Sequence, residues 1–137
     1  MNIVQCEPDS EYFFEVEGLF KVQWPDFSFD NYSAQLPQPI AVVADNKPVA
    51  GIAFTHYSHP LTRKSVIWIN ALYVLPEFRK KGLAKQLLEL ATQKVMASGQ
   101  PQTLAYTDIP ELYQAMGWVE IGASSDSVHK IMAFTMP

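Results

Sequence analysis

Apolar residues recur along the chain with two periods, every second position or every third and fourth, in segments separated by short polar turns. Alternating or wholly apolar runs indicate strands. We expect strands at residues 2–7, 40–45, 49–57, 65–75, 103–106, 118–123 and 128–136. The run SVIWINALYVL is apolar on both faces except at Asn70, which is typical of a central strand covered on both sides. It is the predicted spine of the sheet.

Helical spacing is clearest between residues 82 and 98, where Gly99 provides a C-terminal cap. The apolar face of this segment consists of Ala84, Leu87, Leu88, Ala91 and Val95. Three further helices are predicted: one from Asp9 or Ser10 to residue 24, a weaker one at residues 28–36, and a short one before Gly117. For the short helix, Asp108 and Glu111 resemble a capping box. This order of elements predicts an α/β or α+β sandwich with a mixed sheet.

Composition limits the classes of function. The 137 residues suit one domain, residues 1–137, and a formal charge of -4 disfavours nucleic-acid binding. The acidity weakly favours a cationic substrate such as an amine. The single cysteine, Cys6, allows no internal disulfide, and no Cys/His spacing indicates a metal site. Since no apolar stretch of about 18 residues occurs, we expect a soluble cytoplasmic protein with no membrane contact.

A basic turn connects the central strand to the best helix. Such a turn directs backbone N–H groups and the positive end of the helix dipole at one point, where a phosphate can bind. Gly82 would let the chain approach an anion closely, and the added charge comes from Arg79, Lys80 and Lys81. The alternative is that these cations only solvate the helix start. Three cations there oppose the dipole unless an anion compensates, so we interpret the turn as an anion-binding site.

Two motifs in this half of the chain resemble one family. Arg79-x-x-Gly82-x-Ala84, which follows Leu72-Tyr73-Val74-x-Pro76, resembles the acyl-CoA pyrophosphate motif of the GNAT superfamily of N-acetyltransferases. The segment Leu112-Tyr113-x-x-x-Gly117-Trp118 resembles a second family motif. Together they cover residues 65–122. The resemblance implies a mixed, mostly antiparallel sheet of six or seven strands flanked by about four helices.

The resemblance also implies acetyl-CoA as co-substrate and assigns residues to it. The backbone of Leu72 and Val74 would bind the acetyl-pantetheine arm, and the Leu72 N–H would polarise the thioester oxygen. Tyr113 would act as general acid on the leaving thiolate, although a core aromatic role is the alternative. The cofactor-binding residues expected on this basis are Leu72, Tyr73, Val74, Arg79, Lys80, Lys81, Gly82, Leu83, Ala84 and Lys85.

The general base is less defined. Family members often carry a carboxylate on the central strand, whereas this chain has Asn70, and an amide does not accept a proton. Aminoglycoside acetyltransferases often have an acid at the matching position, so the amide disfavours that substrate class. His56 and His59 are alternatives because histidine titrates near neutrality. A water held by Asn70 and the backbone is equally compatible.

The acceptor pocket is expected among the early helices and the ends of the central strands. The aromatic and acidic segment from Trp24 to Tyr32 suits a cation, although core packing also accounts for its aromatics. The substrate-binding residues expected are Trp24, Phe27, Tyr32 and His56. Three functions stay open: an N-acetyltransferase for a primary amine of a small molecule or peptide, a non-catalytic acyl-CoA-binding regulatory partner, and an interaction domain. Exposed edges of the final strands leave a homodimer open.

Overall fold

The computed structural model describes residues 1–122 and 128–136. Within these ranges the strands are β1 (Asn2–Gln5), β2 (Ile40–Ala44), β3 (Lys47–Ser58), β4 (Ser65–Val74), β5 (Gln102–Thr107), β6 (Val119–Gly122) and β7 (Lys130–Thr135). The helices there are α1 (Glu11–Gln23), α2 (Leu83–Ala97), α3 (Pro110–Gln114) and the 3-10 turn η1 (Pro76–Phe78). The predicted strand at 118–123 ends at Gly122, and Ala123 lies outside the described residues.

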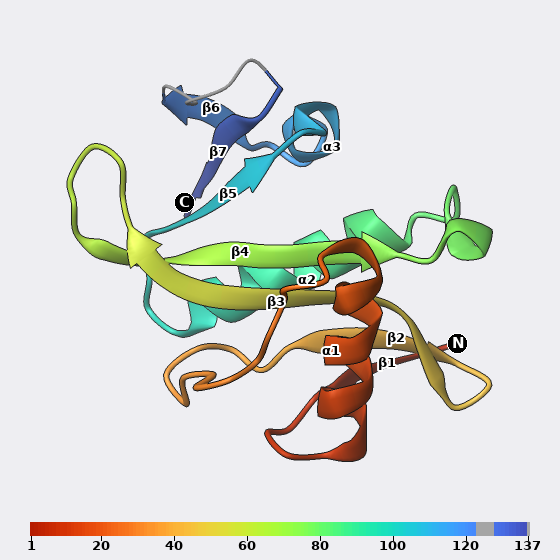
Figure 1. The fold of residues 1–137 in the computed structure, drawn as a ribbon. Helices are drawn as coiled ribbons and strands as arrows, with labels where there is room; N and C mark the ends of the chain where they lie inside the picture. The colour runs from red at the N-terminus through yellow and green to blue at the C-terminus, as the bar shows by residue number, and fades with distance from the viewer. Residues whose placement is uncertain (123–127, 137) are drawn as a thin grey trace.

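All seven of these strands form one sheet in the order β1-β2-β3-β4-β5-β7-β6 (Figure 1). Among the described strand pairs, β4 and β5 are parallel and the others are antiparallel. The parallel connection runs through α2, as a crossover between parallel strands requires. The predicted mixed, mostly antiparallel sheet is confirmed, and β4 is central to it.

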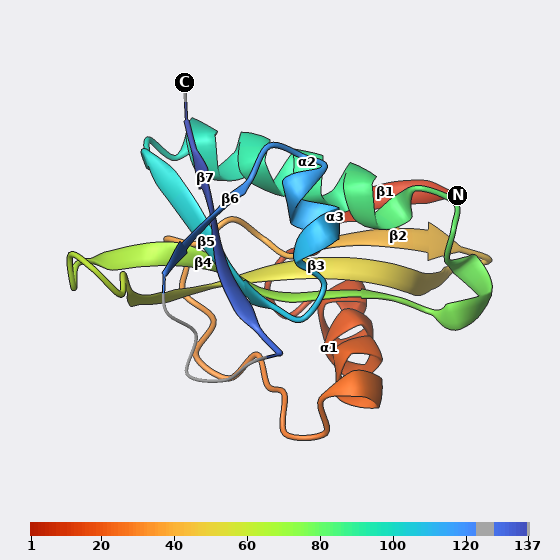
Figure 2. The ribbon, with the colours of Figure 1, turned by 90° about the horizontal axis from the view of Figure 1, so that it is seen from above.

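Helices cover the two faces of the sheet unequally (Figure 2). On one face α2 buries its apolar side, which includes Leu87, Leu88 and Val95, against β2, β3, β4 and β5. On the other face α1 packs its buried residues Val16 and Phe20 against β3 and β4. Because α1 crosses the strands rather than following them, no described helix covers much of this face of the sheet (Figure 1).

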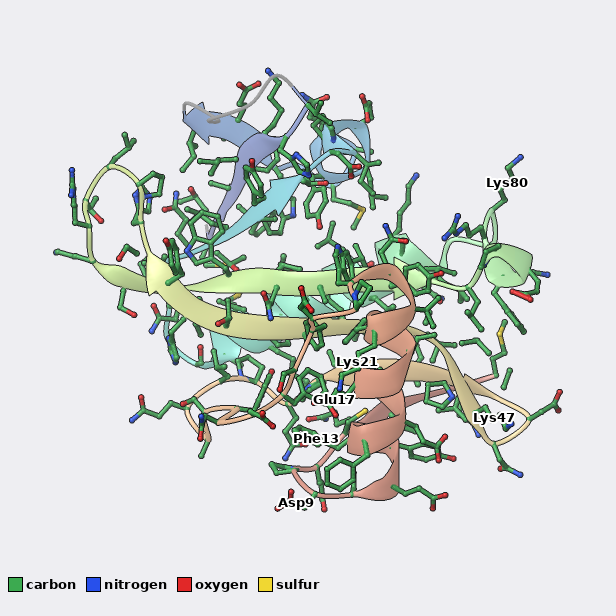
Figure 3. The ribbon with its side chains drawn as sticks, in the orientation of Figure 1. Asp9, Phe13, Glu17, Lys21, Lys47 and Lys80 are labelled. Carbon is green, nitrogen blue, oxygen red and sulfur yellow. The ribbon has the colours of Figure 1, made fainter. Side chains whose placement is uncertain are left out.

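The helix predicted at residues 28–36 is wrong, because the segment between α1 and β2 forms successive turns. Ser28 and Ser33 each accept a hydrogen bond from the backbone N–H two residues later, which competes with helical bonding. The Phe29 N–H donates to the Glu17 carboxylate of α1 at 2.6 Å. Figure 3 shows Glu17 on the same helix as Phe13. The loop is therefore held against α1 by its side chains.

The predicted capping box of the short helix is also wrong. Ile109 is the N-cap of α3, and no side chain among the described residues caps the helix. The Ile109 N–H instead donates to the Thr107 hydroxyl at 2.9 Å. Asp108 is exposed and is consequently left available at the end of β5.

Candidate active site

The site begins where β4 and β5 separate. Their parallel pairing is restricted to Ile67–Ile69 and Thr103–Ala105. The Thr103 hydroxyl closes this paired end by donating to the Ile67 carbonyl oxygen at 2.9 Å. Beyond Ile69, β4 continues beside β3 while β5 follows β7, so a wedge opens between two strands of one sheet (Figure 1).

Backbone groups of β4 are directed into this wedge. The Leu75 N–H donates to the Val49 carbonyl oxygen at 2.9 Å, so Leu75 faces β3. Because consecutive residues of a strand direct their backbone groups to opposite sides, Leu72 and Val74 direct theirs away from β3. On that side the strand has no registered partner past Ile69 within the described residues. The Leu72 N–H is therefore a donor exposed at the wedge.

The turn after β4 presents the start of α2. Gly82 is the N-cap of α2 with φ 79°, and Lys80 also takes a left-handed φ of 64°. A Cβ at Gly82 would meet no described atom within 4 Å, so this glycine serves backbone conformation and access rather than tight packing. No described side chain caps the helix. The first N–H groups of α2 are thus available to an anion.

Arg79 supports this turn from within the chain. Its Nε donates to the Val74 carbonyl oxygen at 2.9 Å, and its guanidinium carbon lies 5.6 Å from the centre of the Tyr73 ring. The side chain therefore fastens the turn to the end of β4. Lys80 instead projects outward from the turn (Figure 3).

A groove of about 750 Å³, called here the helix groove, follows this turn along the wedge. It brings together nine of the ten predicted cofactor-binding residues, all except Lys81, which is exposed in the same turn. Its lining includes Leu72, Tyr73, Val74, Arg79, Lys80, Gly82, Leu83, Ala84 and Lys85. The groove thus joins an open strand edge to a basic helix start, which fits a long ligand with a phosphate at one end.

A larger pocket of about 1090 Å³, called here the sheet trough, lies on the part of the sheet beside α1. Five residues line both it and the helix groove, namely Gln23, Trp24, Leu72, Asp108 and Ile109. The two spaces therefore meet at the wedge, beside the Leu72 backbone. A ligand in one can reach a ligand in the other there.

Asn70 lies on the floor of the sheet trough as an extra residue in β4. Ala53 of β3 is opposite Ala71, and Phe54 is opposite Ile69, so Asn70 has no partner in this ladder. Such a bulge bends the strand and re-aims a side chain. The exposed amide of Asn70 therefore lies among the residues lining the trough, two positions before Leu72.

Tyr113 reaches the trough from α3 and is 4% exposed. Its ring packs edge-on to Trp118 with centres 5.0 Å apart. Burial, and secondarily the nearby Asp108 carboxylate, raises the pKa of the phenol well above its ordinary value. The hydroxyl therefore carries its proton at neutral pH, and the raised pKa makes it a weaker acid than a free phenol.

The two histidines proposed as a base differ in position, since His59 lines the trough and His56 does not. The buried His59 accepts hydrogen bonds at Nδ1 from the Leu61 and Thr62 N–H groups, so its proton is on Nε2, which contacts Gln102 Oε1 at 3.0 Å. Both ring nitrogens are therefore engaged in holding the β3–β4 loop. His56 is exposed and is not among the described residues that line either pocket.

Of the other predicted acceptor residues, Trp24 lines the trough, while Phe27 and Tyr32 do not appear among its described lining. Phe27 packs on Phe20 with ring centres 5.0 Å apart. The Tyr32 hydroxyl donates to the Pro37 carbonyl oxygen at 2.6 Å, and burial raises the pKa of this phenol. Both are partly buried and pack against the core beneath α1.

Several residues that line the trough were not predicted as site residues from the sequence. They come from β3, the β3–β4 loop, β4 and the end of β5, and the most prominent are Tyr57, Arg63, Trp68, Tyr106 and Asp108. The sequence shows that these residues alternate along strands. It does not show which face of the sheet the described helices leave uncovered. Only Asp108 had a local indication, as a polar residue between a strand and a proline.

The sequence of residues 5–118 matches the model of the Acetyltransferase (GNAT) family. The chain therefore belongs to this family. No curated protein matches it in sequence.

Solved structures share the fold over nearly the full length. An aminoglycoside 6′-N-acetyltransferase complexed with coenzyme A is 15% identical, with a TM-score of 0.79 over 100% of this chain and 98% of that one. The aminoglycoside 6′-N-acetyltransferase from Enterococcus faecium is 16% identical, with a TM-score of 0.76 over 100% and 98%. A chain of the NatC complex bound to Gag peptide and CoA is 18% identical, with a TM-score of 0.76 over 100% of both. At these identities the likeness establishes the fold.

No helix in residues 1–122 and 128–136 combines the length and apolarity needed to cross a membrane. Those residues also contain no cluster of His, Cys, Asp or Glu suited to a metal ion.

Proposed function

We propose that this protein is an acetyl-CoA-dependent N-acetyltransferase that acts on a primary amine of a small molecule or peptide by direct attack in a ternary complex. The observation that carries the proposal is the Leu72 N–H, directed into the wedge where the helix groove and the sheet trough meet. The helix groove suits acetyl-CoA and the sheet trough suits the amine. The Leu72 N–H lies between them and can stabilise an oxyanion.

The residues of the helix groove fit acetyl-CoA. The first N–H groups of α2, with Lys80 and Lys85, would bind the pyrophosphate through charge-assisted hydrogen bonds. The backbone of Leu72 would bind the pantetheine amides as a neighbouring strand would. The Val74 carbonyl already accepts from Arg79, so we assign it to the turn rather than to the ligand.

The acetyl transfer forms a C–N bond and breaks the C–S bond of the thioester. Attack by the amine places negative charge on the thioester oxygen, and the Leu72 N–H stabilises that charge. The departing thiolate takes a proton, for which Tyr113 is the donor that lies in the trough.

The attacking amine must first lose a proton. Asn70 cannot accept it, but the amide projects from the β4 bulge into the trough and can orient a water that does. This assignment agrees with the engaged nitrogens of His59 and with the position of His56 outside the described lining.

Calorimetric titration of acetyl-CoA into the wild type and Gly82→Glu tests the proposal. The variant places a carboxylate where the phosphate would bind, so we expect micromolar binding by the wild type and a loss of more than about tenfold in the variant. Gly99→Glu is the matched control, since Gly99 also has a positive φ and open space, but at the other end of α2. Absence of wild-type binding would refute the proposal.

A second function, non-catalytic acyl-CoA binding, is favoured by one observation, the amide of Asn70 in place of a carboxylate. Acetyl-CoA binding without thiol release across a broad panel of primary amines would support it. Release of CoA with any one amine would decide for the transferase.

A further inference from the structure

The sheet trough has an aromatic floor and walls. Trp68 of β4 and Tyr57 of β3 meet edge-on with ring centres 6.0 Å apart, and the Trp68 indole N–H donates to the Tyr57 carbonyl oxygen. Tyr57 is 67% exposed, whereas Trp68 is 8% exposed. Tyr106 stacks on His129 at 4.6 Å and forms part of the opposite wall. Tyr57 and Tyr106 therefore supply the exposed aromatic surface along the trough, and Trp68 lies largely buried beneath it.

Charge in the trough is sparse and polarised. Asp108 is the one carboxylate among its described lining residues, and Arg63 is the one guanidinium. Asp108 follows the end of β5, beside the wedge. Arg63 belongs to the β3–β4 loop, which the His59–Gln102 contact joins to the beginning of β5. The six residues of β5 separate these two ends by about 20 Å.

This distribution of charge favours a monoamine over a polyamine. A single ammonium beside the wedge would contact Asp108, and an aromatic or apolar body would cover Trp68 and Tyr57. A polycation would find one carboxylate among the described lining residues, and its further charges would approach Arg63. Like charges in a partly enclosed space repel each other more strongly than in bulk water.

We propose that the acceptor is a primary monoamine on a flat aromatic or apolar body, with its ammonium group bound by Asp108 and its body lying along the trough toward Arg63. The inference rests on the proposed acetyl transfer and specifies its acceptor. Asp108 lines both pockets, so the nitrogen it binds lies beside the Leu72 N–H. That nitrogen releases one proton to water before it attacks the acyl carbon. As the C–N bond forms and the C–S bond breaks, Tyr113 protonates the departing thiolate and regains a proton from the nitrogen.

The test uses 2-phenylethylamine as the monoamine probe and spermine as the polycation, in equilibrium titrations at low ionic strength with and without saturating CoA. Trp24 and Trp68 line the trough, so tryptophan fluorescence reports occupancy besides heat. We expect 2-phenylethylamine to bind at least about tenfold more tightly than spermine. Spermine binding as tight as or tighter than that of 2-phenylethylamine, or binding of neither, would overturn the proposal.

Two charge variants locate the contacts. Asp108→Asn is expected to weaken 2-phenylethylamine binding about tenfold, while Glu111→Gln, an equal charge change on exposed α3, leaves it unchanged. Arg63→Glu is expected to strengthen spermine binding several-fold, while Lys64→Glu, its neighbour outside the described lining, does so less. Equal responses within either pair would contradict the assigned positions.

The outcomes separate the two proposals. Acetyl-CoA binding measured on its own decides whether the protein uses this donor at all. If acetyl-CoA binds and turns over only with spermine, the transferase stands and the monoamine assignment fails. If acetyl-CoA does not bind but 2-phenylethylamine does, in an Asp108-dependent manner, the trough assignment stands as a binding site and the transferase fails.

Discussion

The Arg79 Nε donates a 2.9 Å hydrogen bond to the carbonyl oxygen of Val74, five residues earlier, and thereby ties the basic turn to the end of β4. Arg79 is thus a positioning residue for the turn as well as a source of charge. We expect Arg79→Ala to raise the dissociation constant of acetyl-CoA about fivefold to tenfold in calorimetry, because the turn loses its anchor. Lys64→Ala, just before β4 and thus at the opposite end of this strand from the turn, should have no effect. An unchanged constant in Arg79→Ala would show that the turn holds its shape without this bond.

Tyr113→Phe should lower kcat about a hundredfold, because the hydroxyl that donates to the thiolate is lost. The ring and its contact with Trp118 remain, so thermal unfolding and the dissociation constant of acetyl-CoA should change little. Steady-state kinetics combined with a melting curve checks this. A fall in stability without a selective fall in kcat would assign Tyr113 to the core alone.

Asn70→Ala should lower kcat about tenfold while leaving the folded state intact. The residue has no partner in the β3–β4 ladder, so its removal breaks no registered pair. Urea unfolding should give a free energy within about 0.5 kcal/mol of the wild type. If kcat is unchanged, a water oriented by Asn70 is not the route by which the amine is deprotonated.

Gly51→Ala should destabilise the fold by about 1–3 kcal/mol. A Cβ at Gly51 would lie 2.6 Å from Val16 Cγ2 and 3.1 Å from the Phe20 ring, where α1 crosses β3. Gly18→Ala is the matched comparison, because Gly18 lies within α1 with no described atom within 4 Å of a new Cβ. It should stabilise the protein by about 0.5–1 kcal/mol through helix propensity. Equal changes in the free energy of unfolding for the two variants would mean that α1 shifts readily where it crosses β3.

The folded protein should lose stability in alkali. Burial raises the pKa of the Cys6 thiol from 9.0 to about 11. As the pH rises, the unfolded chain releases this proton before the folded chain does. The free energy of unfolding is therefore unaffected by the thiol below about pH 9 and falls between about pH 9 and pH 11, by at most about 1.4 kcal/mol per pH unit. Tyr32 and Tyr113, whose pKa values are also raised by burial, extend the decline. Chemical unfolding across this range should show it, with a shallower slope in Cys6→Ala.

The helix groove was predictable because its determinants are local. A strand, a basic turn, Gly82 and an amphipathic helix are consecutive in sequence, and their conformations follow from period, φ preference and capping. The same holds for β4, in which Asn70, the polar residue within the apolar run, proved to be the residue at which the ladder is interrupted.

The sheet trough was not predictable from local pattern. Phe27 and Tyr32 have the composition of a cation site, yet they pack under α1, because their loop is drawn inward by Glu17 and by the buried aromatic cluster. Trp68 and Tyr106 belong to different strands, and only the sheet order brings them to one trough. The turns at residues 28–36 also depend on serine side chains, whose competition with helical bonding outweighed the weak periodicity.

The extra residue in β4 reverses the phase of the strand. Before it, Ile67 and Ile69 face α2 and Trp68 faces the trough; after it, Leu72 faces α2 and Ala71 faces α1. Position 70 thus belongs to neither of the two paired halves of the strand. Its side chain can be exchanged without shifting the register on either side, so a change of chemistry at this position leaves the architecture of the sheet unaltered.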